Sequence, residues 1–199
     1  MAVPASARLC TALCAIVYFG VATGADPGPA THYSLDPGKS RLDFEFVQAG
    51  ARNQGHFGQL AVSLDLAADN PAGGKLDVQV PTSSIDTGDK ERDDTLKGAD
   101  LFDIAKYPQA RFTSSQITRT ANGYEAVGKL TLRGVTRDQR VAFVLRNAQE
   151  QGKAVTYLTG KTTVKRLDFG IGQGDWKSTE WVGNEVLVSY SLRLVSTPH

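Results

Sequence analysis

Hydrophobic and polar residues alternate one by one along most of this chain, and this period of two constrains its fold more than any other feature. Successive side chains of a β-strand point to opposite faces, so such alternation is typical of strands with one buried face. In RLDFEFV, Leu42, Phe44 and Phe46 fall on one face, with Asp43 and Glu45 on the other. Similar runs are 60–66, 76–80, 124–132, 141–145, 154–166 and 186–194. The pattern predicts an all-β protein.

The connections between these runs are mostly short, with turn residues such as Asn122–Gly123 and Gly134. Only the segment from Ser83 to Pro108 is long enough to hold a helix between two strands. Parallel strands need long crossover connections, so the sheet should be antiparallel. A barrel of about eight such strands avoids exposed sheet edges. We therefore expect an extended antiparallel β-barrel with one short helix.

The long segment has the signals of a helix at its centre. Asp89 can cap the run KERDDTLK, Lys90 lies four residues before Asp94, and Gly98 can end the helix. Leu96, Leu101 and Phe102 would then pack on the barrel. The helix would act as a plug or lid across one barrel end, or pack there with no gating role. Both interpretations stay open.

The first residues have the features of a secretory signal peptide. Arg8 precedes the apolar run Leu9–Val21, which is too short to span a membrane, and small residues follow at 22–25. We expect cleavage near Ala25, which gives a signal peptide of residues 1–25 and a mature domain of residues 26–199. The mature protein would be periplasmic or secreted. A retained membrane anchor is the alternative.

The charge and the chemistry of the mature chain exclude several classes of partner. The chain has 22 basic and 21 acidic residues, and loss of Arg8 with the signal leaves 21 of each. This balance argues against nucleic acid and anionic membranes as partners, and we expect no stable membrane insertion of the mature chain. Both cysteines, Cys10 and Cys14, also leave, and no two histidines have metal-ligand spacing. We expect no metal and no cofactor, and a solvated helix face for the acidic cluster 86–94.

Signals for catalysis are missing from the sequence, whereas aromatic residues on the strands are plentiful. No serine lies in G-x-S-x-G, and the glycines of residues 170–174 lack the context of a phosphate loop. The aromatic candidates for a ligand-binding interior are Phe44, Phe46, Phe57, Phe102, Phe112, Tyr124, Phe143, Tyr157, Phe169 and Trp181. A small barrel is either filled by such side chains or keeps a cavity for one ligand. The small residues Ala126, Gly128, Ala142 and Gly160 favour some interior room.

Five blocks of sequence resemble the YceI-like family of secreted, lipocalin-like polyisoprenoid-binding proteins. The blocks are SSIDTG (83–88), ERDDTLKGADLF (91–102), YPQARF (107–112), LTLRGVT (130–136) and RLDFGIGQGDW (166–176). They occur in the family's order, and the likeness extends from about Tyr33 to Leu194. The resemblance implies a lipocalin-like barrel whose apolar interior holds a polyprenyl lipid or quinone for transport or storage. The resemblance is also compatible with a homodimer.

The resemblance further assigns roles to single residues. Phe102 and Phe112 would line the interior, whereas Asp86, Arg92, Gly134 and Asp168 would be turn and anchoring residues. Gln48 and Thr95 stand where family members often have histidine. This chain would therefore handle the polar end of its ligand differently and respond less to pH.

Two other functions remain to be distinguished from lipid binding. One is an extracytoplasmic enzyme that acts on a lipid with carboxylates such as Asp86 and Asp168. The other is an interaction module with no ligand and a filled barrel. Paired carboxylates in a cleft would favour the enzyme, a solid interior would favour the module, and an apolar cavity would favour lipid binding.

Overall fold

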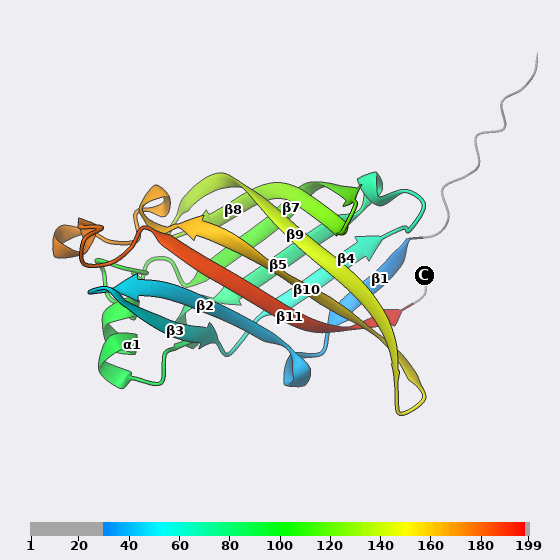
Figure 1. Ribbon diagram of the computed structural model, residues 1–199, viewed down its shortest axis with the longest axis horizontal. Coiled ribbons are helices and arrows are strands. Elements are labelled where there is room, and N and C mark those ends of the chain that lie inside the picture. The colour runs from blue at the N-terminus through cyan, green and yellow to red at the C-terminus, as the bar shows by residue number, and fades with distance from the viewer. Residues whose placement is uncertain (1–29, 198–199) are drawn as a thin grey trace, which may run out of the picture.

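The computed structural model describes residues 30–197, which form one antiparallel sheet with a short helix (Figure 1). The strands are β1 (Thr31–Leu35), β2 (Arg41–Gln48), β3 (Ala51–Phe57), β4 (Ala61–Leu66), β5 (Lys75–Pro81), β6 (Ile85–Asp86), β7 (Gln109–Thr120), β8 (Gly123–Leu132), β9 (Val135–Glu150), β10 (Lys153–Lys165) and β11 (Glu185–Thr197). The helices are α1 (Lys90–Lys97) and the 3-10 turns η1 (Pro37–Lys39), η2 (Pro71–Gly73), η3 (Thr82–Ser84), η4 (Arg166–Phe169) and η5 (Gly174–Lys177). The predicted signal peptide lies outside the described residues.

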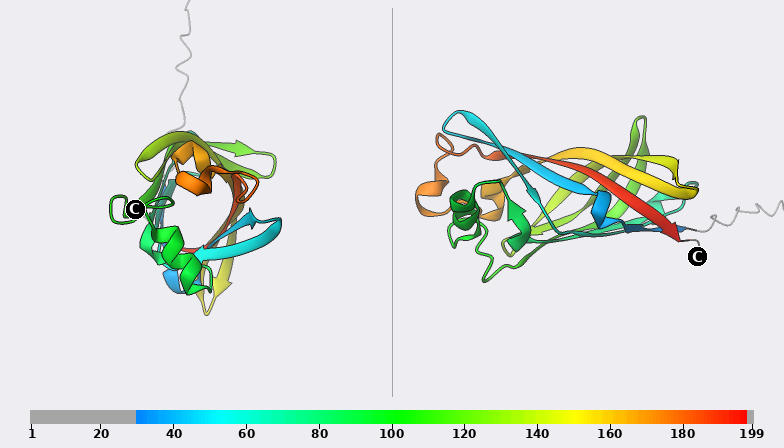
Figure 2. Two further views of the ribbon diagram at one scale, coloured as in Figure 1. Left: turned by 90° about the vertical axis from the view of Figure 1, so that its left-hand side faces the viewer. Right: turned by 90° about the horizontal axis from the view of Figure 1, so that it is seen from below.

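Eight of the eleven strands close into a barrel, which confirms the predicted architecture. Their order is β1-β4-β5-β7-β8-β9-β10-β11, and β11 pairs back to β1. One edge of β11 pairs with two strands: β1 pairs with residues 194–197 and β2 with residues 187–191. Strands β2, β3 and β6 extend the wall beside α1. Viewed along the barrel, α1, the β2–β3 hairpin and the turns η4 and η5 surround one end (Figure 2).

The tight hairpin between β8 and β9 shows why glycine is needed in the block LTLRGVT. Arg133 and Gly134 have φ angles of 46° and 72°, the left-handed values that match the twist of a two-residue hairpin. A Cβ on Gly134 would also lie 2.5 Å from the ring of Tyr107. The turn therefore fits beneath the YPQARF segment, and Gly134 is a turn residue as expected.

The barrel is filled at the end where β1 and β4 close it. Leu64, Ile117, Ala126 and Leu194 are completely buried there. The predicted faces are confirmed for Leu64, Ala126 and Leu194, which belong to the alternating runs, whereas Ile117 lies outside those runs. The interior room that the small residues favoured does not lie beside Gly160. A Cβ on Gly160 would lie 2.6 Å from the ring of Tyr190, so the missing side chain makes space for tyrosine.

The helix α1 begins and ends at the predicted residues. The Asp89 carboxylate accepts a hydrogen bond from the Arg92 amide at 3.1 Å, and the Gly98 amide donates to the Thr95 carbonyl. Lys90 and Asp94 form an ion pair of 2.5 Å. Within residues 30–197, no helix has the length and apolar character needed to cross a membrane.

One acid of the cluster 86–94 has a structural role instead of a solvated position. Asp93 accepts hydrogen bonds from the Thr87 amide at 2.8 Å and the Thr87 hydroxyl at 2.7 Å. It thereby fixes the loop that enters α1. In the described part of the chain, no three His, Cys, Asp or Glu side chains are grouped to hold a metal ion.

A polar network ties the start of the described chain to the β9–β10 hairpin. The buried Arg193 guanidinium binds the carboxylates of Asp36 and, at 3.2 Å, Glu150. Glu150 also accepts a hydrogen bond from the Tyr157 hydroxyl and one from Lys39 at 3.0 Å. These donors, the tyrosine first, lower the pKa of Glu150 from 4.5 to about 2. The carboxylate therefore stays charged in moderate acid.

This network predicts a defined acid limit of stability. Because the folded pKa of Glu150 is about 2 and its ordinary value 4.5, its contribution is complete above the ordinary value and is lost as the pH falls towards 2. We expect Glu150→Gln to unfold at lower urea concentration than the parent at pH 7, with the difference shrinking between those two pH values. The control is Glu45→Gln, since the Glu45 side chain is 45% exposed and lies 3.9 Å from Arg52. A Glu150→Gln deficit that is the same at pH 7 and pH 2 would contradict the assignment.

Candidate ligand cavity

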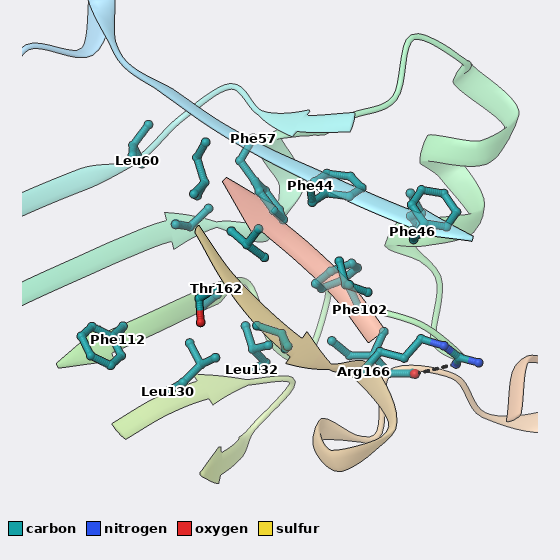
Figure 3. A pocket seen from close by; sticks show the side chains of 18 of the residues that line it. Phe44, Phe46, Phe57, Leu60, Phe102, Phe112, Leu130, Leu132, Thr162 and Arg166 are labelled. Carbon is teal, nitrogen blue, oxygen red and sulfur yellow. Dashed lines mark hydrogen bonds between the residues drawn. The ribbon is translucent and has the colours of Figure 1, made fainter. Parts of the chain in front are cut away.

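A cavity of about 470 Å³ occupies the barrel half beside α1. This volume lies in the range of roughly 300–1,000 Å³ that is usual for small-molecule sites. The inward faces of the strands form its wall, as the period of two predicts. In Figure 3, Phe46 and Arg166 lie toward the α1 end, whereas Leu60 and Phe112 lie deeper in the barrel. The wall is almost entirely aliphatic and aromatic.

Four phenylalanines form one side of the cavity. The ring centroid of Phe44 lies 6.1 Å from that of Phe46 and 5.4 Å from that of Phe57, and Phe57 meets Phe102 edge-on at 6.2 Å. Gly55 makes this arrangement possible, because a Cβ there would lie 2.4 Å from the Phe44 ring. The aromatic row joins β2 and β3 to the segment after α1. It provides a continuous apolar surface from the mouth inward.

The mouth of the cavity lies beside α1 and is polar. Asp89 and Glu91 are exposed there, and Arg92 and Thr95 are half-buried. The Thr95 hydroxyl donates a hydrogen bond to the Glu91 carbonyl at 2.8 Å, so its proton is used within the helix. Gln48, on β2, also lines this region. Positions 48 and 95 thus offer an amide and a hydroxyl at the mouth, and neither group titrates near neutral pH.

A buried arginine supports the rim of the cavity. Arg166 is 4% exposed, and its guanidinium donates five hydrogen bonds to backbone carbonyls. The acceptors are the carbonyls of Ile171, Trp176, Ser178, Val182 and Gly183. No carboxylate in the described part of the chain forms an ion pair with it, and burial lowers its pKa. Its role is to hold the loop between η5 and β11 against the barrel.

At its inner end, here called the floor, the cavity wall meets the packed core. The residues that belong to both are Leu76, Phe112, Leu158, Tyr190 and Leu192. The Tyr190 hydroxyl donates to the Ala142 carbonyl, and burial raises the pKa of this tyrosine. Beyond this floor, within residues 30–197, the interior is packed with the fully buried side chains described above. The cavity therefore runs from the mouth at α1 to a floor near the middle of the barrel.

The structure separates the ten predicted ligand-binding aromatics into two groups. Phe44, Phe46, Phe57, Phe102 and Phe112 lie on the cavity wall. Their contact with a ligand stays a prediction.

The other five aromatics lie away from the cavity wall. Tyr124 and Phe143 stack on each other at 5.4 Å in the filled end, and Phe169 is buried in a second apolar cluster with Leu101 and Ile171. Tyr157 is on the outer face, where it binds Glu150, and Trp181 is 66% exposed. Aromatic type alone did not distinguish these positions from wall positions.

Sequence reasoning missed most of the wall, which is aliphatic. Examples are Leu130, Val141, Val188 and Leu192, and the rim residues Arg166 and Trp176 were also missed. The aliphatic positions belong to the alternating runs, so the signal was present in the period of two. Nothing in the alternation pattern indicated Arg166. Its partners are backbone carbonyls, which leave no trace in the identity of the residues that carry them.

An eight-stranded antiparallel barrel around an apolar cavity is the architecture of lipocalin-like proteins. Within that class, the YceI-like domain model matches residues 33–194, and the chain belongs to this family. The UPF0312 protein of Yersinia enterocolitica is 41% identical over 83 residues, which cover 42% of this chain and 43% of that protein. The chain thus aligns with less than half the length of such curated relatives.

Solved structures support the same assignment. Burkholderia cenocepacia BcnA superposes with a TM-score of 0.73 and 31% identity, over 80% of this chain and 98% of that one. The Campylobacter jejuni YceI protein gives a TM-score of 0.61 and 24% identity, over 73% and 84% of the two chains. A polyisoprenoid binding domain from Saccharophagus degradans gives 0.56 and 19%, over 83% and 98%. The last two similarities concern the fold alone.

Proposed function

We propose that this protein holds one long apolar lipid of the isoprenoid type, a polyprenyl lipid or a quinone, for transport or storage. The observation that carries the proposal is the apolar cavity of about 470 Å³ with a polar mouth. Its shape suits a chain-like molecule with one polar end. Membership of the YceI-like family and the likeness to a barrel described as a polyisoprenoid binding domain support the same ligand class.

The energetics favour a carrier or a store. Each buried CH2 group contributes about 0.8 kcal/mol relative to water, so an isoprenoid chain would leave the cavity for water very slowly. Transfer of the ligand into a membrane or micelle recovers most of this energy. The preference of the ligand for the protein over a membrane is therefore modest. The bound molecule is thus retained in water and released where a membrane is available.

We also propose that the protein acts outside the cytoplasm, in the periplasm or as a secreted protein. The positively charged residue Arg8 and the apolar run Leu9–Val21 support export. Intact-mass measurement of the soluble exported protein should place its N-terminus between Ala22 and Pro29. A soluble species that still carries Leu9–Val21 would contradict this proposal.

The two other functions are less well supported. Asp86 and Asp168, the carboxylates of the enzyme hypothesis, are exposed and do not line the apolar cavity. Asp168 lies instead in a separate surface pocket with Asp138 and Glu185, where Arg137 and Lys165 supply opposite charge. Asp86 instead accepts a hydrogen bond from the Gly88 amide at 2.7 Å, which fits an anchoring role in a turn. A filled barrel is contradicted by the cavity itself.

The direct test is to identify what the protein carries. The protein should be purified without detergent from its native compartment, extracted with organic solvent and analysed by mass spectrometry. We expect about one isoprenoid lipid per chain, because a cavity of this size takes one ligand. The same protein after denaturation, washing and refolding is the matched control. Extracts with only membrane phospholipid, in the proportions of the control, would refute the proposal.

A further inference from the structure

Two exposed hydrophobic side chains lie together on the rim of the cavity. Among residues 30–197, four large hydrophobic side chains are exposed, and Trp181 at 66% and Val47 at 41% are two of them. The other two, Val144 and Val195, lie on β9 and β11. Single exposed apolar residues are ordinary on protein surfaces. Trp181 and Val47, in contrast, lie near each other at the rim of the cavity.

The backbone pairing shows that both residues belong to one short ribbon. Gln48 and Val182 form an antiparallel bridge, which is flanked by hydrogen bonds from the Ala49 amide to the Trp181 carbonyl at 2.7 Å and from the Gly183 amide to the Val47 carbonyl at 2.9 Å. Side chains alternate across such a ribbon. Gln48 and Val182 face the cavity, so Val47 and Trp181 share the opposite face as diagonal neighbours. The ribbon is thus a single-layer wall between the cavity and the exposed pair.

The loop that carries Trp181 is held firmly. Arg166 binds the carbonyls of Val182 and Gly183 on one side of Trp181 and those of Trp176 and Ser178 on the other. These bonds restrain the backbone on both sides of Trp181 through one buried guanidinium. The 66% exposed indole is thus carried by an anchored part of the rim, where an apolar partner can cover it.

We propose that Trp181 and Val47 dock the rim of the cavity onto a lipid bilayer, so that the ligand passes directly between membrane and cavity. This inference rests on the proposed function. A bilayer is the partner that matches both the ligand inside the wall and the apolar pair outside it. Tryptophan favours the interface between acyl chains and water, where its ring is buried and its N–H stays wet. The nearby Arg52 and Glu45 have opposite charges, so docking does not require anionic lipid.

The first test measures how the ligand leaves. The protein is loaded with a fluorescently labelled geranylgeraniol and mixed with phosphatidylcholine vesicles. If transfer needs docking, its rate rises with vesicle concentration, whereas release through water has a rate that does not depend on it. We expect the first behaviour, and a fall of about tenfold in Trp181→Ser, equivalent to about 1.4 kcal/mol. Val144→Ser is the matched control, because it removes an exposed apolar side chain far from the ribbon, and it should transfer at the parent rate.

The second test needs no ligand and separates the two proposals. With the rim residue Trp176 replaced by phenylalanine, Trp181 is the sole tryptophan of the sequence, and vesicles of brominated phosphatidylcholine should quench its fluorescence. In the protein that keeps both tryptophans, Trp181→Ser should lose most of the quenching. If the probe binds but its transfer depends on neither vesicle concentration nor Trp181, docking is refuted and the lipid-binding function stands. If the probe does not bind while quenching persists, the lipid-binding function fails and docking stands. A dimer that Trp181→Ser converts to a monomer in sedimentation would assign the pair to a second copy and refute docking.

Discussion

Replacing Phe44 with lysine is expected to remove the bound lipid almost completely. Phe44 is buried at the centre of the aromatic row, against Phe46 and Phe57. A lysine there would place an ammonium group in an apolar volume, where a charge is poorly solvated. The loss of the ring should cost about 3–5 kcal/mol of stability, as for other core phenylalanines. Lipid content, measured by extraction and mass spectrometry of the folded protein, should fall more than about tenfold, since each 1.4 kcal/mol lost is a factor of ten.

The matched control for this variant is the neighbouring residue Glu45. Glu45→Lys introduces the same side chain on the outward face of the same strand, and its lipid content should equal that of the parent. If Phe44→Lys does not fold, Phe46→Lys takes its place, because Phe46 is half-buried nearer the mouth. A folded Phe44→Lys or Phe46→Lys protein with the parent's lipid content would show that the ligand does not occupy this cavity.

Replacing Arg166 with methionine is expected to be among the most destabilising single changes in the chain. The guanidinium satisfies five backbone carbonyls at once. Methionine fills similar volume but donates no hydrogen bond. The Ser178 carbonyl keeps its bond from the Val182 amide at 3.3 Å, whereas the carbonyls of Ile171 and Val182 lose a buried donor, and each unsatisfied buried group costs about 1–3 kcal/mol. For these two buried acceptors we expect a loss of about 2–6 kcal/mol in the free energy of unfolding, measured by urea denaturation. The loop between η5 and β11 should lose protection from hydrogen exchange first.

Lysine distinguishes geometry from charge at this position. Arg166→Lys keeps the positive charge but has three donors on one nitrogen, which cannot match a planar fork of five. It should recover less than half of the stability lost with methionine. Arg137→Met is the control, since Arg137 is exposed and bonds only its neighbour's carbonyl. Arg166→Lys within about 1 kcal/mol of the parent, the size of an ordinary surface change, would show that charge and not geometry matters.

The barrel and its faces could be predicted from the sequence because the strands obey one simple rule. Leu42, Phe44 and Phe46 face inward, as their alternation with Asp43 and Glu45 requires. The ends of α1 were predictable for a similar reason, since Asp89 and Gly98 act on backbone groups a few residues away. Local geometry determines both features.

The candidate site was predictable only in part, because facing inward does not decide between cavity and core. Phe112 and Phe143 both point into the barrel, yet one lines the cavity and the other packs in the filled end. The difference depends on which side chains from distant strands meet at each level. Gly160 is a second example. The space that its missing side chain leaves is occupied by the ring of Tyr190 from the neighbouring strand β11. Contacts of this kind have no signature within a single run.

The position of the cavity floor limits the length of ligand that the barrel can enclose. Leu158, Tyr190 and Leu192 belong both to the cavity wall and to the packed core, so a chain that enters from α1 would end at the depth where this core begins. An isoprenoid that is too short leaves the deepest part of the wall uncovered, and one that is too long leaves its last units outside. For the isoprenoid ligand proposed above, the position of the floor would therefore set a preferred number of isoprene units.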